Sequence, residues 1–217
     1  MTKDEYIKYA DKFGDWAPGW NAIDDCFKKL YPNQEPKHYG TNIANRAIFG
    51  GDQYLDGVSI YQSQKGYAHI VTYGMSELYA NPDAFGGEYS KWGYEMTIKL
   101  PADIEYMWAI DMLSHLARYT FTKKSYFEPF QYISGGGNPI KAGSDSKLTA
   151  LIVVQDTELK EIETLHGKLD FMQLVGITQK ELEVIMNNPD MGKELVEKMK
   201  NDNLMLVTDL SRKKDYL

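Results

Sequence analysis

Histidine and carboxylate side chains are the residues of this sequence that can support acid–base chemistry, and one set lies in neighbouring predicted strands. His69 falls inside the apolar run from Ala68 to Met75, and Asp56 and Glu95 lie beside or within two similar runs. Paired strands can bring an imidazole next to a carboxylate, the arrangement that a general base requires. Because a one-residue shift in register moves a side chain to the opposite face of a sheet, the sequence permits an enzyme site at His69 without specifying it.

No recognised catalytic motif accompanies these residues. The sequence contains neither HExxH nor GxSxG, and the glycine run GGGNP at 135–139 lacks the Lys-Ser/Thr pair that completes a phosphate-binding loop. We interpret this run as a flexible loop. The histidines are far apart in the sequence, and none has a second ligand residue at a metal-binding helical spacing; they are His38, His69, His115 and His166. The sequence therefore predicts no catalytic residue, metal or cofactor.

Composition and charge restrict the class of protein. The chain has 217 residues, 43% of them hydrophobic, which is enough for one domain with its own core. Cys26 is the only cysteine, so no internal disulfide is expected and a cytoplasmic location is predicted. The net charge of −7, with a single basic run at 212–214, argues against nucleic-acid binding. The most apolar run, Leu148 to Val154, is too short to cross a membrane. The acidic N-terminus has no apolar stretch of the kind found in signal peptides, so secretion is not expected.

The elements that position these residues change type along the chain. Thr2 and Glu5 have the spacing of a capping box, which predicts an N-terminal helix over 2–13. A second helix is predicted to begin at Pro18 and to end before Pro32. Strands are then predicted over Gly57 to Tyr61, Ala68 to Met75 and Trp92 to Leu100. Apolar residues at 94, 96, 98 and 100 alternate with polar ones in the last strand, so we expect it to have one buried face.

The second half of the chain continues this alternation of helices and strands. A helix over 103–121, with Pro101 at its first turn, is expected to pack on the sheet. The stretch 128–147, rich in Gly, Pro and Ser, is predicted to be a functional or mobile loop. Strands over 148–154, 169–177 and 203–210 and helices over 178–187 and 190–200 complete the pattern. The predicted fold class is α/β (α+β): a central mixed β-sheet flanked by helices in a single domain.

Aromatic side chains gather between the central helix and the following loop. Such residues provide a large contact area with few rotatable bonds, which favours a recognition surface. For Phe121 and Phe127 we expect core positions, whereas core and surface are both open for the residues beside Pro129. The cluster consists of Tyr119, Phe121, Tyr126, Phe127, Phe130 and Tyr132.

Ordered motifs along the chain make it resemble the suppressor of fused domain family. The most specific are GMSELY at 74–79 and LARYTF at 116–121. The others are WAPGWNAI at 16–23, LYP at 30–32, LDGVSIY at 55–61, GYEMTIKL at 93–100, FMQLVGIT at 171–178 and Thr208-Asp209. The resemblance covers about residues 16–212, and the chain looks like the bacterial single-domain branch of the family.

This resemblance implies an α/β fold and a non-enzymatic role. The animal members hold an extended peptide of a transcription factor between this domain and a second, C-terminal one. We expect that second domain to be absent here, so the transcription-factor role is not carried over. The family's contacting tyrosine falls on Tyr119 and a phenylalanine on Phe127. A contacting aspartate falls near Gln131, where this sequence departs, and Glu128 is the nearest acid.

Three hypotheses follow for the function. The first is an immunity protein that neutralises a cognate polymorphic toxin by direct association, because many bacterial members of the family are associated with such systems. The second is a regulatory adaptor that binds a peptide near Tyr119 and Phe127 by adding it to a sheet edge. The third is an enzyme that uses His69 with a carboxylate. A protein partner is expected in the first two, and the oligomeric state is left open.

Overall fold

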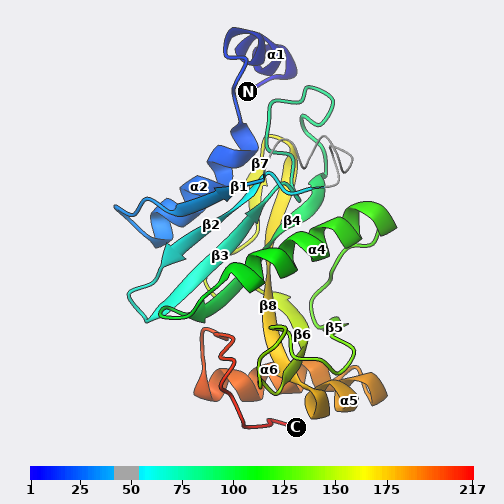
Figure 1. Cartoon of the computed structure of the whole chain (residues 1–217). Helices are drawn as coiled ribbons and strands as arrows, with labels where there is room; N and C mark the ends of the chain where they lie inside the picture. Colours follow the sequence, from blue (N-terminus) through cyan, green and yellow to red (C-terminus); the bar gives the residue numbers. More distant parts are fainter. Residues whose placement is uncertain (42–53) are drawn as a thin grey trace.

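The computed structural model describes residues 1–41 and 54–217, and a mixed β-sheet forms its centre (Figure 1). The helices are α1 (Lys3–Lys12), α2 (Pro18–Leu30), α4 (Met107–Lys123), α5 (Gln179–Asn187) and α6 (Met191–Asp202). The strands are β1 (Lys37–Gly40), β2 (Gly57–Gln62), β3 (Tyr67–Tyr73), β4 (Tyr89–Pro101), β5 (Tyr132–Ser134), β6 (Leu148–Gln155), β7 (Ile162–Thr164) and β8 (Gly167–Thr178).

The sheet has the strand order β1-β2-β3-β4-β8-β6-β5, with β7 paired to β8 outside this path. The β4–β8 pair is parallel and the other pairs are antiparallel, so the sheet is mixed. This agrees with the predicted central mixed sheet. None of the helices in the described residues is both long and apolar enough to span a membrane.

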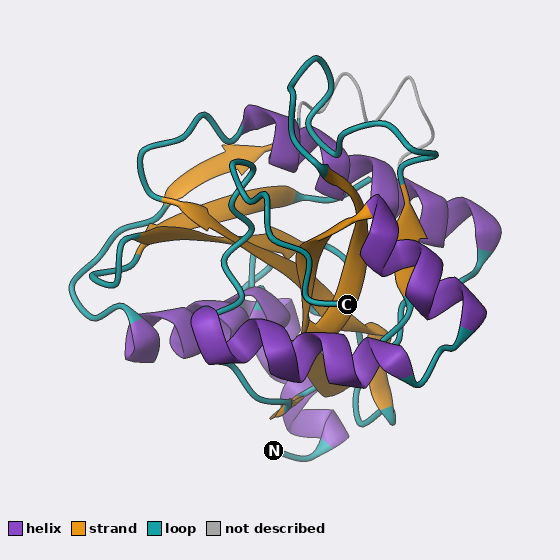
Figure 2. Ribbon diagram, turned by 90° about the horizontal axis from the view of Figure 1, so that it is seen from below, coloured by secondary structure: helices purple, strands orange, loops and turns teal. Residues whose placement is uncertain are grey.

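Alternation along β8 shows how the helices cover the two faces of the sheet. Met172 and Leu174 pack in the cluster that contains α4. Phe171 packs with α2, and Val175 and Ile177 pack with α5 and α6. Helix α4 therefore covers one face, whereas α2 and the α5–α6 pair cover opposite ends of the other face (Figures 1 and 2).

The predicted helix starts at both ends of the chain are confirmed. The Thr2 and Thr178 side chains each accept a hydrogen bond from the backbone N–H three residues later in the chain. The Glu5 and Glu181 carboxylates in turn accept from the backbone N–H of Thr2 and Thr178. These reciprocal bonds satisfy N–H groups that a helix start leaves unpaired. The strands predicted within 57–100, 148–154 and 169–177 are also present.

Several predicted boundaries were wrong. Pro101 ends β4, and α4 begins only at Met107, because residues 102–105 form a turn. Residues 203–210 do not form a strand: the Asn203 side chain bonds both backbone groups of Val207, and Leu206 has a left-handed φ of 52°. The predicted loop 128–147 contains the short strand β5, and β1 and β7 were not predicted.

The expectation of one buried face for β4 was also wrong. Glu95, Thr97 and Lys99 have no exposed surface, like the apolar residues with which they alternate. Strand β4 lies between β3 and β8, and its polar face is covered as well as its apolar one. The polar side chains tolerate burial because each is hydrogen-bonded or ion-paired.

Candidate protein-binding site

His69 lies in a buried polar cluster, but with partners other than those predicted. Its Nε2 lies 2.9 Å from the Asp156 carboxylate, and its Nδ1 lies 2.9 Å from the Tyr31 hydroxyl. Asp156 also accepts from Thr97 at 2.6 Å and from Lys99 Nζ at 3.1 Å. The predicted grouping of His69 with Asp56 and Glu95 was therefore wrong.

Strand register explains that correction. His69 is opposite Lys99 in β4, so Glu95 lies four residues further along the strand. There Glu95 accepts bonds from Thr72, from the backbone N–H groups of Gly74 and Ser76, and from the Ser76 hydroxyl. Asp156 lies 87 residues after His69, directly after β6. Sequence spacing does not reveal that β6 lies beside β8, so it could not identify this partner.

The electrostatics of the cluster favour a neutral imidazole beside a charged carboxylate. Burial lowers the pKa of His69 and outweighs the opposing effect of Asp156, and the nearby Lys99 lowers it further. Burial alone would raise the pKa of Asp156, but its contacts with His69, Lys99 and Thr97 hold that pKa well below the usual range. With Nε2–H donating to Asp156, Nδ1 accepts from Tyr31. His69 and Asp156 have no exposed side-chain surface, so the cluster holds β3, β4 and the β6–β7 loop together.

Three of the four predicted binding residues instead lie on the surface, at the end of α4 and in the segment that follows it: Tyr119, Glu128 and Gln131. Tyr119 is 47% exposed and stacks on Phe127, with ring centroids 6.3 Å apart and planes at 15°. Phe127 is buried, as predicted, and so is Phe121. Glu128 and Gln131 bond to each other, since Gln131 Nε2 donates to the Glu128 carboxylate at 3.0 Å. The structure thus places the four residues in two adjacent pairs.

These pairs lead into β5, the last strand in the sheet order. Gly135 N–H donates to Thr149 of β6 at 2.8 Å, and Ile133 is opposite Leu151. Because alternate residues of an antiparallel strand direct their backbone groups to opposite edges, Tyr132 and Ser134 direct theirs away from β6. No other strand of the described residues pairs with this edge.

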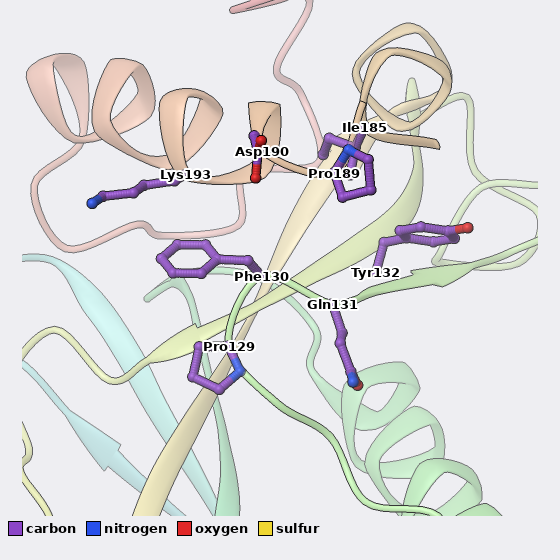
Figure 3. Close-up of a pocket in the computed structure, with 8 residues that line it drawn as sticks. All are labelled: Pro129, Phe130, Gln131, Tyr132, Ile185, Pro189, Asp190 and Lys193. Atoms are coloured by element: carbon purple, nitrogen blue, oxygen red, sulfur yellow. The ribbon is translucent and has the colours of Figure 1, made fainter. Parts of the chain in front are cut away.

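Exposed aromatic side chains line a recess beside the same edge. A cavity of about 710 Å³ lies between residues 129–132 and the α5–α6 corner, where Ile185, Pro189, Asp190 and Lys193 complete its wall. Figure 3 shows Phe130 and Tyr132 directed towards α5 and α6, and Gln131 directed to the other side. Phe130 and Tyr132 are 40% and 41% exposed, so both are available for contact.

The sequence analysis did not identify every part of this site. The aromatic cluster indicated the surface, but the open edge of β5 was hidden in a stretch interpreted as a loop. Asp156 also went unnoticed, although an acid at the end of an apolar strand was a usable signal. Within residues 1–41 and 54–217, no three His, Cys, Asp or Glu side chains are arranged to hold a metal ion.

Comparisons with known proteins place this arrangement in a family. A family model described as suppressor of fused protein (SUFU) matches residues 51–213. The human and mouse suppressor of fused homologs are each 27% identical over 179 residues, which cover 76% of this chain and 36% of theirs. The chain thus aligns with about a third of the length of these relatives.

Solved structures show the same fold. A chain of the Sufu–Fu complex matches with a TM-score of 0.79 and 26% identity, covering 92% of this chain and 93% of that one. Drosophila Suppressor of Fused matches with a TM-score of 0.78 and 26% identity, covering 92% of this chain and 51% of that one. A SUFU homolog from Neisseria gonorrhoeae, 16% identical, matches with a TM-score of 0.62 over 92% of this chain and 97% of that one, a likeness of fold alone. The chain belongs to the suppressor of fused family, as its sequence motifs had indicated.

Proposed function

We propose that this protein is a non-enzymatic binding domain that holds an extended segment of a protein partner along the open edge of β5. The observation that carries the proposal is the edge itself, with its outward backbone groups beside the exposed rings of Phe130 and Tyr132. An added strand gains main-chain hydrogen bonds, and side-chain contacts give specificity. Phe130 and Tyr132 are exposed and directed towards α5 and α6, whereas Gln131 is directed to the other side.

The buried cluster supports the non-enzymatic part of the proposal. A general base must reach the proton that it removes. Both ring nitrogens of His69 are already bonded, and the ring has no exposed surface. Nothing in this geometry brings a substrate to the imidazole.

Replacing Ser134 by proline is expected to abolish binding of a peptide selected on the purified protein from a display library of short random sequences. Proline removes the outward N–H of Ser134, one of the donors on which an added strand depends. The matched control is Ser134→Ala, which also removes the hydroxyl bonded to Gly136 N but keeps the backbone donor. Equal peptide affinities for the two variants, measured by calorimetry, would exclude strand addition at β5.

Replacing Tyr119 by alanine is expected to lower the affinity for the same peptide at least about tenfold, because aromatic anchors often dominate the free energy of binding. The fold is expected to persist, since Tyr119 is 47% exposed. Circular dichroism and calorimetry on one sample separate the two effects. An unfolded variant would show that Tyr119 is a core residue, and unchanged affinity would remove it from the site.

For the biological role we propose a cytoplasmic bacterial immunity protein that neutralises a toxin by direct association. The support is the resemblance to the bacterial branch of the family, together with the net charge of −7, which favours encounter with a basic partner. The alternative is a regulatory adaptor that binds a peptide, and the open β5 edge supports this role as well as it supports the immunity role.

Expression of the adjacent open reading frame is expected to stop growth of a tolerant host, and coexpression of this protein is expected to restore it. Growth curves with and without this protein measure the effect, and Ser134→Pro serves as the binding-deficient control. Toxicity without rescue, or no toxicity, would reject the immunity role and leave the adaptor.

A further inference from the structure

A second recess lies at an irregularity of β4. Tyr89 is opposite Lys168 of β8, and the next pair is Tyr94 with Asp170, so β4 advances five residues while β8 advances two. The additional residues bulge out and leave a cavity of about 540 Å³ between β4, the first half of β8 and residues 126–129. Bulges of this kind redirect side chains and are common beside functional sites.

The bulge is specified by its own sequence. Gly93 has a φ of 78°, a conformation that glycine adopts without steric cost. A Cβ atom at this position would lie 3.2 Å from the Tyr89 ring. Glycine therefore permits both the turn of the backbone and the position of Tyr89 at the rim of the recess.

Aromatic rings form much of the wall. Tyr89 and Tyr126 are 56% and 55% exposed, and Trp92 is half-buried between them and the core. The face of an aromatic ring attracts a cation, most strongly when the ring is tryptophan. Trp92 already shows this property, because the ammonium of Lys124 lies 5.8 Å from its ring centroid.

Carboxylates outnumber cations around the same cavity. Glu128, Glu161 and Asp170 line it, against Lys91 as the single lining cation among the described residues. The Lys91 ammonium is occupied, since it donates to the Gly74 carbonyl at 2.7 Å. The Glu161 carboxylate has no hydrogen-bond or ion-pair partner within the part of the chain that the structure describes. Asp170 accepts bonds from the Gln155 side chain and the Phe171 N–H, so its oxygens retain acceptor capacity.

We propose that this recess binds an arginine side chain of the protein partner. A guanidinium is planar, so it can stack on an exposed ring while it donates to two carboxylates. An anionic or apolar side chain would leave Glu161 and Asp170 without a counter-charge. The identity of the occupant rests on the proposed function, namely that the chain binds a protein. The recess shares Pro129 with the cavity beside β5, whereas Glu161 and Asp170 line the recess and not that cavity.

The test uses the isolated protein and a small probe, so its result does not depend on strand addition. Nα-acetyl-arginine methylamide is titrated into the ¹⁵N-labelled protein, and the same titration is run with the citrulline analogue, which has the same shape without the charge. Saturable shifts are expected for the Trp92 indole and Gly93 amide signals with arginine and not with citrulline. Equal responses to both probes, or shifts spread over unrelated surfaces, would overturn the proposal.

Two variants locate the contact. Glu161→Gln is expected to weaken binding of the arginine probe about threefold, a usual size for one exposed charge pair. Glu163→Gln removes the same charge two residues away, outside the cavity lining, and is expected to change the affinity much less. Equal effects of the two variants would show that the probe responds only to the net charge of the protein, and would reject the site. Loss of arginine binding with peptide binding at β5 intact would separate this inference from the proposed function.

Discussion

Replacing Asp156 by asparagine is expected to lower the free energy of unfolding by about 3–5 kcal/mol, the usual cost of breaking a buried ion pair. The carboxylate accepts from His69, Thr97, Lys99 and the backbone N–H groups of Glu158 and Leu159. Asparagine keeps the shape, but it removes the charge and turns one acceptor into a donor that faces other donors. Among the described residues, Lys99 then keeps Glu158 alone as a counter-charge.

Urea unfolding followed by circular dichroism measures this change. Asp145→Asn is the matched control, because Asp145 is exposed and lies outside the cluster. Its expected effect is within about 0.5 kcal/mol, as for most surface substitutions. A loss for Asp156→Asn no larger than that of the control would show that the cluster contributes little to stability.

Acidification is expected to destabilise the protein in two steps, the first of which begins as the pH falls below about 6.5. Burial and Lys99 lower the pKa of His69, so the unfolded chain takes up a proton there before the folded protein does. The folded state therefore loses stability as the pH falls below the ordinary histidine pKa. The second step begins near about pH 4, where unfolded aspartate gains a proton but Asp156, with its depressed pKa, does not.

Glu95 has the opposite effect on the pH dependence of stability. Burial raises its pKa, despite the bonds from Ser76 and Thr72, so protonation stabilises the folded state as the pH falls. Urea unfolding at several pH values separates the contributions, because His69→Gln is expected to reduce the first step and leave the others. The remainder of that step comes from His38 and His166, whose pKa values burial also lowers. His115→Gln is the control, since His115 is exposed. A wild-type stability that stays constant from neutral pH to about pH 5 would contradict the account of His69.

Local signals in the sequence were enough to predict most elements. The capping boxes at Thr2 and Thr178 and the prolines at 18 and 32 place helix ends through bonds and backbone limits that act within a few residues. Runs such as Leu148 to Val154 mark strands because their burial is continuous. The prediction of a closing strand over 203–210 was wrong because it also relied on apolar content. The Asn203 side chain folds this segment into a turn through its bonds to Val207.

The surface residues were found by a mixture of signals. Tyr119 and Phe127 came from the family resemblance, and the structure stacks them, but their role in binding stays a prediction. Phe130 and Tyr132 came from the density of aromatic residues, and they flank the open edge of β5. The bulge at Gly93 was not recognised, because register between β4 and β8 depends on residues about eighty positions apart.

The amino-acid sequence was sufficient to predict the class of fold, the starts of α1, α2 and α5 and most of the strands, because capping, backbone restriction and hydrophobic periodicity act over short distances. It also determined the family, through motifs in a fixed order. The three-dimensional structure was needed to show which strand lies at the open edge of the sheet and which carboxylate contacts His69. The open edge and the His69 contact both depend on pairing between segments that are distant in the sequence. The alternation of residue types within one strand also does not show what covers each face of that strand.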